Sequence, residues 1–171
     1  MLSYRHGFHA GNFADVFKHA VLCLLAEALV KKDKPLFCLD THAGSGRYDL
    51  NSAMAAKNRE YLGGIGRLWR TESPPAEFAS YLDAIRRLNH GSRLRFYPGS
   101  PELLRQFLRA GDRMVLCELH GSDAAHLRQE YGGDIRADKA GWRLQTFYGV
   151  RCVRYTPGAS FRTAEPPLAY V

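Results

Sequence analysis

The chain opens with a helical pattern of apolar and polar positions. Between residues 13 and 30 the apolar side chains recur at steps of three and four, as expected for an amphipathic helix; they are Phe13, Val16, Phe17, Ala20, Val21, Leu24, Leu25 and Leu29. Asn12 is a good N-cap, and Asp15 falls in the first turn, where a negative charge opposes the helix dipole. We therefore predict a helix that begins after Asn12 and ends in the lysine-rich segment before Pro35.

Two short unbroken apolar runs, at residues 36–39 and 114–117, read as buried strands. The first runs into a glycine-rich loop. About 70 residues separate the two runs, more than a plain crossover needs, and helical spacing returns at 78–88 and 101–108. The expected fold is α/β: a Rossmann-like sheet with one crossover helix and an inserted helical subdomain at about residues 50–110.

The pattern of charged and apolar residues changes after residue 142. Residues 143–171 carry four arginines against one acidic residue and sustain no period of 2 or 3.6. This segment does not resemble the second half of an α/β sheet. We divide the chain into residues 1–142, the N-terminal part of the α/β domain, and residues 143–171, a tail without a predicted structure.

Composition narrows the class of protein. The 171 residues include 24 Lys and Arg against 17 Asp and Glu, a formal charge of +7, which favours an anionic partner such as nucleic acid over an ordinary basic protein only weakly. No signal peptide or membrane-length apolar run is visible, and the cysteines form no C-x-x-C pair. We expect a soluble, cytoplasmic protein without a disulfide framework; its cysteines are Cys23, Cys38, Cys117 and Cys152.

The ends of the two predicted strands carry the residues suited to a cofactor. Asp40 ends the first strand, and Gly44-x-Gly46 follows, a pattern that lets a nucleoside cofactor approach the backbone but that is more often a simple turn. Glu118 ends the second strand, where a carboxylate either accepts hydrogen bonds from ribose hydroxyls or is merely solvated. An acidic residue about 20 residues after the loop would indicate NAD; the longer spacing here favours S-adenosylmethionine.

The first nineteen residues are rich in histidines, cations and aromatic rings. Tyr4, Arg5, His6 and Lys18 combine positive charge with rings that stack on bases, which suits contact with RNA as well as an incidental basic tail. The histidines lack zinc spacing, so we predict no metal site; they are His6, His9, His19 and His42.

Four blocks of sequence resemble one family. Residues 4–19 (YRHGFHAGNFADVFKH), 39–48 (LDTHAGSGRY), 97–101 (YPGSP) and 118–120 (ELH) are similar to the RlmJ family of large-subunit ribosomal RNA adenine N6-methyltransferases, in the family's order. The resemblance implies a monomeric enzyme that transfers a methyl group from S-adenosylmethionine to an adenine N6 of 23S ribosomal RNA. It implies a role in RNA contact for Tyr4, and a cofactor site lined by His19, His42, Ser100 and Glu118, with a loop shaped by Asp40, Gly44 and Gly46.

Two departures from the family pattern limit what the resemblance implies. The family's Lys-Ala-Asp-Gly segment is replaced by Lys139-Ala140-Gly141, so Gly141 or Asp138 would have to stand in at the adenine ring. The catalytic Asp-Pro-Pro-Tyr/Phe is absent, and we interpret the nearest segment, which begins at Glu165, as a coincidence: Glu165 is at most a stand-in, and no catalytic residue is assigned.

The chain would then be a truncated or frame-shifted copy, inactive and poorly soluble. Two other hypotheses remain at this point. One is a non-catalytic remnant that binds nucleic acid, and the other is a role in the use of external DNA.

Overall fold

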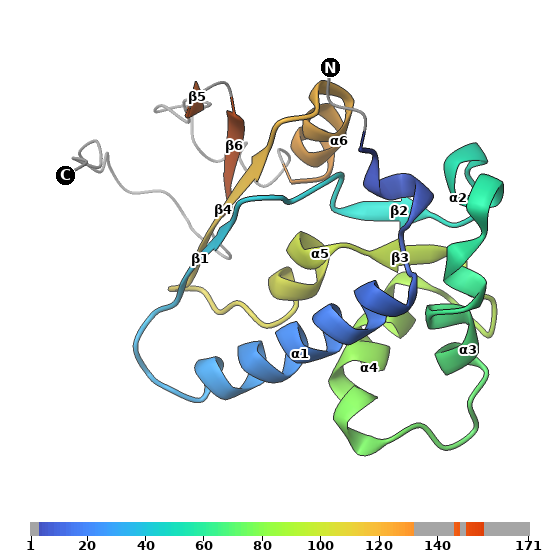
Figure 1. Ribbon diagram of the computed structural model, residues 1–171. Helices are drawn as coiled ribbons and strands as arrows, with labels where there is room; N and C mark the ends of the chain where they lie inside the picture. Colours follow the sequence, from blue (N-terminus) through green and yellow to red (C-terminus); the bar gives the residue numbers. More distant parts are fainter. Residues whose placement is uncertain (1–3, 132–145, 148–149, 156–171) are drawn as a thin grey trace.

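The computed structural model describes residues 4–131, 146–147 and 150–155 (Figure 1). Its helices are η1 (His6–Phe8), α1 (Phe13–Val30), α2 (Ala53–Asn58), η2 (Glu60–Leu62), α3 (Ile65–Trp69), η3 (Ala76–Phe78), α4 (Ala79–Leu88), α5 (Ser100–Arg105) and α6 (Gly121–Tyr131). Its strands are β1 (Phe37–Asp40), β2 (Arg47–Asp49), β3 (Phe96–Pro98), β4 (Arg113–Glu118), β5 (Thr146–Phe147) and β6 (Val150–Tyr155).

The two predicted strands form and pair with each other. β1 and β4 are parallel neighbours, with Phe37 opposite Arg113 and Asp40 opposite Leu116, in a four-stranded sheet of order β1-β4-β6-β5. β6 runs antiparallel to β4, so a strand forms in the region where the sequence shows no sustained period. Its antiparallel direction differs from the parallel strand that the second half of a doubly wound sheet would add.

A second, two-stranded sheet was not predicted. β2 and β3 pair antiparallel, with Tyr48 opposite Tyr97. Between them along the chain lie α2, α3 and α4 with two short 3-10 turns, which bears out the expected helical content of the insertion. The predicted helix at 78–88 matches α4, whereas the one at 101–108 ends earlier, at Arg105. The boundaries of the proposed domains stay a prediction.

Helix α1 begins and ends where the sequence predicts. The Asn12 Oδ1 atom accepts the backbone N–H of Asp15 at 2.9 Å, as an N-cap should. No helix among the described residues is long and apolar enough to cross a membrane.

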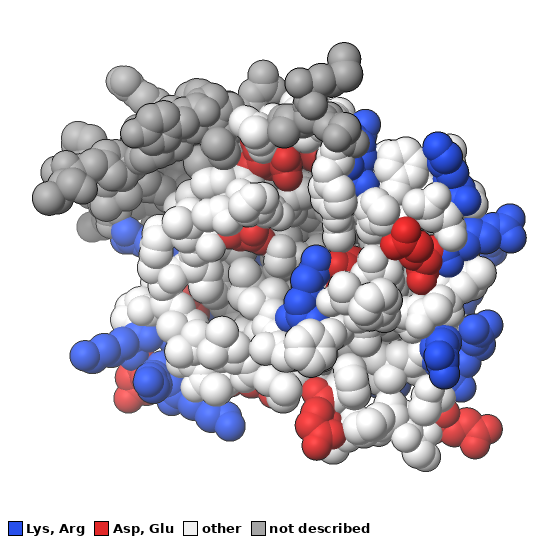
Figure 2. Space-filling view, in the orientation of Figure 1, with Lys and Arg blue, Asp and Glu red and all other residues white. Residues whose placement is uncertain are grey.

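The packed side of α1 differs from the side that its large apolar residues indicate. The residues buried on α1 are small or polar: Asp15, His19, Ala20, Cys23 and Ala26. The large apolar residues are mostly exposed: Phe13, Phe17, Val21, Leu24 and Leu25. We call these five the outer face of α1. For most of the helix, the large apolar residues therefore do not mark the packed side. Figure 2 shows a largely uncharged surface, interrupted by a few charged side chains, where α1 lies in Figure 1.

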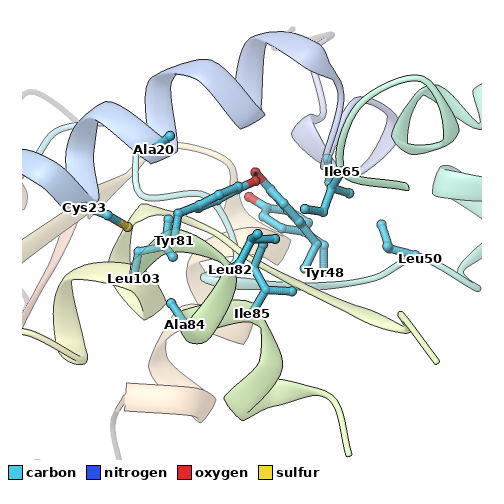
Figure 3. Close-up of a cluster of buried hydrophobic side chains, with 12 residues drawn as sticks. Ala20, Cys23, Tyr48, Leu50, Ile65, Tyr81, Leu82, Ala84, Ile85 and Leu103 are labelled. Atoms are coloured by element: carbon cyan, nitrogen blue, oxygen red, sulfur yellow. Dashed lines mark hydrogen bonds between the residues drawn. The ribbon is translucent and has the colours of Figure 1, made fainter. Parts of the chain in front are cut away.

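The core lies between α1, α4 and the β2–β3 ribbon (Figure 3). Tyr81 reaches from α4 toward Ala20 and Cys23 of α1, whose small side chains leave room for the ring. The Tyr81 and Tyr97 hydroxyls are 3.0 Å apart, so both buried hydroxyls have a partner. Small residues on α1 thus let an aromatic core approach the helix closely.

Arg109 holds the segment between α1 and β1 in place by hydrogen bonds to its backbone. Its guanidinium donates to the carbonyl oxygens of Val30, Lys32 and Lys34 at 2.6–3.0 Å. It also pairs with both oxygens of Asp112, and Asp112 Oδ1, which accepts from Arg109 Nη2, also accepts the Leu36 N–H at 2.7 Å. One arginine therefore satisfies the carbonyls that follow α1 and ties the start of β1 to the start of β4.

Two leucines give a direct test of the outer face. Leu103 is 0 % exposed in the core and Leu24 is 41 % exposed on α1. Leu103→Ala should lower the free energy of unfolding by about 2–5 kcal/mol because it leaves a cavity. Leu24→Ala should change the free energy of unfolding by no more than about 0.5 kcal/mol. Urea unfolding of both variants measures the difference. Equal losses would show that the outer face of α1 is packed in solution.

Candidate cofactor site and N-terminal arm

The glycine-rich loop follows β1 and turns sharply back into β2. Gly44 and Gly46 have φ angles of 62° and 78°, in the left-handed region that favours glycine. A Cβ at Gly44 would collide with the Tyr48 hydroxyl, and one at Gly46 would lie 2.6 Å from the Tyr131 ring. The Tyr48 hydroxyl accepts the Ser45 N–H at 3.3 Å. Both glycines are therefore needed for the turn and for the aromatic rings packed beneath it.

Glu118, at the end of β4, lies directly against this loop. Its carboxylate accepts the Gly44 N–H at 2.8 Å and the His120 N–H at 2.7 Å. A carboxylate has about four lone-pair directions, and the described residues use two of those of Glu118. The ends of β1 and β4 therefore meet at this loop.

Asp40 and Ser100 close the other side of the loop. The Ser100 hydroxyl donates to Asp40 at 2.6 Å, and the His42 N–H donates to the other Asp40 oxygen at 3.1 Å. Ser100 is the first residue of α5, so this bond ties α5 to the end of β1. The structure thus gathers five of the predicted cofactor residues around one loop: Asp40, Gly44, Gly46, Ser100 and Glu118. The His42 side chain is exposed on the same loop, where its Nδ1 lies 2.9 Å from the Thr41 hydroxyl.

His19 lies apart from that group. It is 4 % exposed, and its hydrogen bond, at 2.8 Å, and its ring contact are both with Tyr97 in the core. Burial lowers the pKa of His19 to about 4, although the nearby Asp15 charge acts in the opposite direction. The ring is neutral near pH 7, and its role in holding the cofactor stays a prediction.

The N-terminal residues form an ordered arm. Tyr4 is 65 % exposed, yet its hydroxyl lies 2.9 Å from His6 Nδ1 and its ring stacks on His9 with centroids 5.4 Å apart. His9 is in turn held by Glu60 at 2.9 Å. Arg5 pairs with Asp123 of α6 at 3.2 Å. Arg5 is therefore fixed against α6, and Tyr4 is held by two histidines of the arm itself.

Buried Asp15 joins this arm to α1. Its carboxylate accepts from His6 Nε2 at 2.9 Å, from the Gly11 N–H at 2.8 Å and from Lys18 Nζ at 2.6 Å. Burial would raise the pKa of Asp15, but the hydrogen bond from His6 and the neighbouring positive charges hold it well below the usual value. Lys18 is half exposed, and its ammonium group contacts Asp15.

Tyr48 connects the arm to the loop. The edge of the His6 ring meets Tyr48 with centroids 5.2 Å apart, and the Tyr48 hydroxyl holds the loop at Ser45. Sequence reasoning assigned no site role to Tyr48, Glu60 or Asp15. Tyr48 comes two residues after the second glycine, and that spacing was the only available signal. Asp15 reads from sequence as an ordinary first-turn acid.

Three further expectations concern a metal site and two residues near the C-terminal end of the chain. No group of three His, Cys, Asp or Glu side chains within them is arranged to hold a metal ion. Gly141 and Glu165 lie outside the described residues.

Comparison with known proteins adds independent findings. Residues 33–146 match the family model described as ribosomal RNA large subunit methyltransferase D, RlmJ. The chain is 52% identical over 137 residues to ribosomal RNA large subunit methyltransferase J of Escherichia coli, covering 80% of this chain and 49% of that protein. It is 50% identical over 135 residues to the Haemophilus influenzae protein of the same name, covering 78% and 48%.

A solved structure is also similar. The crystal structure of a protein from Legionella pneumophila matches with a TM-score of 0.65 and 46% sequence identity, over 70% of this chain and 43% of that one. The chain spans about half the length of the curated relatives it matches.

The buried imidazole of His19 predicts a pH dependence. The folded pKa, about 4, lies below the ordinary value of 6.5, so the unfolded chain binds a proton first as the pH falls. The free energy of unfolding should therefore decrease between about pH 6.5 and pH 4. Urea unfolding across this range should show a smaller decrease for His19→Gln. A proton NMR titration that places the His19 midpoint above 6 would contradict the prediction.

Proposed function

Because the chain belongs to the ribosomal RNA large subunit methyltransferase J family, we propose that it binds S-adenosylmethionine and serves methylation of an adenine N6 in 23S ribosomal RNA. The cofactor site in this proposal is the loop from Asp40 to Gly46 together with Ser100 and Glu118. The RNA site is the N-terminal arm with Lys18. We further propose that the protein acts as a monomer inside the cell.

The contact of Glu118 with the Gly44 backbone carries the cofactor proposal. It puts a carboxylate, two of whose acceptor directions are not used by the described residues, at the glycine turn that follows β1. The two adjacent hydroxyls of an adenosine ribose are suitable donors for such a carboxylate.

The element after the loop favours S-adenosylmethionine over a dinucleotide. A dinucleotide's pyrophosphate is bound at the N-terminus of a helix that directly follows the glycine loop. Here the loop enters strand β2 at Arg47, so no helix N-terminus is presented there. A cofactor without phosphate groups fits this loop better.

In this proposal the residues of the chain bind the cofactor and align the acceptor nitrogen with its methyl group. S-adenosylmethionine brings the reactive methyl group on its sulfonium, so the protein contributes mainly the alignment of the acceptor nitrogen. Asp40 and Ser100 hold the loop in shape, and Glu118 would hold the ribose. The exposed ring of Tyr4 would stack on an RNA base beside the ammonium group of Lys18.

The adenine amino group is a poor nucleophile, so methyl transfer to it requires further groups of the enzyme. Its lone pair is shared with the ring, so it must be flipped out and its hydrogens must meet acceptors. The Asp-Pro-Pro-aromatic segment that the resemblance implies for this task does not occur in the sequence. That absence favours a second candidate function, nucleic-acid binding without catalysis, which would show RNA affinity without affinity for S-adenosylmethionine.

Glu118→Gln tests the cofactor site. Calorimetric titration with S-adenosylmethionine should show binding to the unmodified chain and a loss of about tenfold to a hundredfold in the variant, because a charged acceptor is removed. Glu77→Gln, an exposed change of the same kind on η3, should bind normally. Unaltered affinity in Glu118→Gln would reject this site, and no binding to the unmodified chain would favour the second candidate.

Methyl transfer is tested separately. We expect the purified 171-residue chain to transfer no methyl group from labelled S-adenosylmethionine to unmodified 23S ribosomal RNA, because its sequence lacks the Asp-Pro-Pro-aromatic segment that the resemblance implies for binding the amino hydrogens. The Escherichia coli relative serves as the positive control. Incorporation of label by this chain alone would show that another segment supplies those acceptors.

A further inference from the structure

The inference begins with the burial of one acidic side chain. Asp15 is 1 % exposed although it lies in the first turn of a helix, where a solvent-exposed acid would interact with the helix dipole equally well. Burying a carboxylate costs several kcal/mol unless it is paired and hydrogen-bonded. The burial of Asp15 therefore calls for an explanation beyond helix capping.

The three partners of Asp15 come from three places in the N-terminal region. Gly11 precedes the helix, His6 belongs to η1, and Lys18 lies one turn further along α1. Each donates to the carboxylate, at 2.8, 2.9 and 2.6 Å. One buried group thus fixes the direction of an exposed cation and of a half-buried ring.

The His6 imidazole, held by Asp15, in turn orients the Tyr4 hydroxyl. A carboxylate only accepts hydrogen bonds, so the hydrogen facing Asp15 lies on His6 Nε2. In the neutral ring the other nitrogen, Nδ1, then accepts the Tyr4 hydroxyl at 2.9 Å. Asp15 thereby determines which way the imidazole presents its acceptor to Tyr4, although it does not touch Tyr4 itself.

The same ring lies beside the cofactor loop. His6 meets Tyr48 edge-on, and Tyr48 holds the Ser45 N–H. The arm is therefore held at a defined place next to the loop where the proposed cofactor would bind.

We propose that Asp15 is a positioning residue for RNA: it holds His6 and Lys18 so that Tyr4 and Lys18 present one preformed aromatic and cationic surface to an RNA base and its phosphate. The proposal rests on the proposed function, since it takes RNA as the ligand of the arm. Asp15 itself, being buried, contacts no RNA.

Asp15→Asn separates positioning from simple electrostatics. The amide keeps the size of the side chain but has one acceptor oxygen for three donors. Removing a negative charge from a basic protein should by itself tighten binding to a polyanion. Loss of positioning should instead weaken it, by about tenfold. The probe is a short unmodified fragment of 23S ribosomal RNA, measured by fluorescence anisotropy.

Two controls exclude a general loss of structure. Asp83→Asn makes the same chemical change at an exposed site on α4 and should leave RNA affinity unchanged or slightly higher. In Asp15→Asn, affinity for S-adenosylmethionine should stay within about twofold, because Asp15 does not contact the cofactor loop. Equal weakening toward both ligands, or RNA binding as tight as in the unmodified chain, overturns the proposal.

A double-mutant cycle tests the route through His6. His6→Gln leaves Asp15 its bonds to Gly11 and Lys18 but removes the imidazole that joins Asp15 to Tyr4 and that contacts Tyr48. If Asp15 acts on Tyr4 through His6, the double variant should bind RNA no more than about twofold more weakly than the poorer single variant. Losses that multiply fully would show that Asp15 and His6 act independently, which contradicts the route.

A measurement on the unmodified chain tests, without RNA, whether Asp15 positions His6 and Lys18. Nitrogen-proton NMR should show the hydrogen of the His6 ring on Nε2 and a Lys18 side chain with restricted motion. A ring protonated only on Nδ1, or a freely rotating Lys18, overturns the proposal even if Asp15→Asn does not fold. If the unmodified chain binds no RNA, the proposed function fails, while this measurement still determines whether Asp15 positions the arm.

Discussion

The parallel pairing of β1 with β4 is the constraint on which the rest of the structure depends. Parallel neighbours cannot be joined by a tight turn, so the chain must travel from one end of the sheet to the other between them. The residues that make this journey form the helical insertion, the β2–β3 ribbon and α5. The pairing also brings Asp40 and Glu118 to the same edge, and Arg109 with Asp112 fixes the opposite ends of both strands.

The sequence predicted those parts of the site that depend on strand ends. Two apolar runs, each followed by an acidic residue, identified the strands that end in Asp40 and Glu118, and their parallel pairing in the structure brings these ends to one edge. The β2–β3 ribbon was missed because strands of three residues are too short to show an alternation.

The burial and the hydrogen-bond partners of His19 and Asp15 could not be predicted from sequence patterns. Periodicity identified the helix correctly, but its large apolar residues do not mark the packed side, where the small residues Ala20 and Cys23 share the core with Tyr81. A polar residue on the packed side of a helix looks, in sequence, like a residue on its solvent side. Only their partners distinguish the two cases. His19 contacts Tyr97 of β3, and Asp15 contacts His6 of the short helix η1.

The outer face of α1 has a consequence for the lifetime of the chain in a cell. Chaperones and proteases recognise exposed apolar segments and continuously triage the molecules that carry them. A molecule that keeps Phe13, Phe17 and Leu25 uncovered presents such a segment even when its core is fully folded. Its abundance would then be governed by how fast this face is captured or covered, and much less by the stability of the core beneath it.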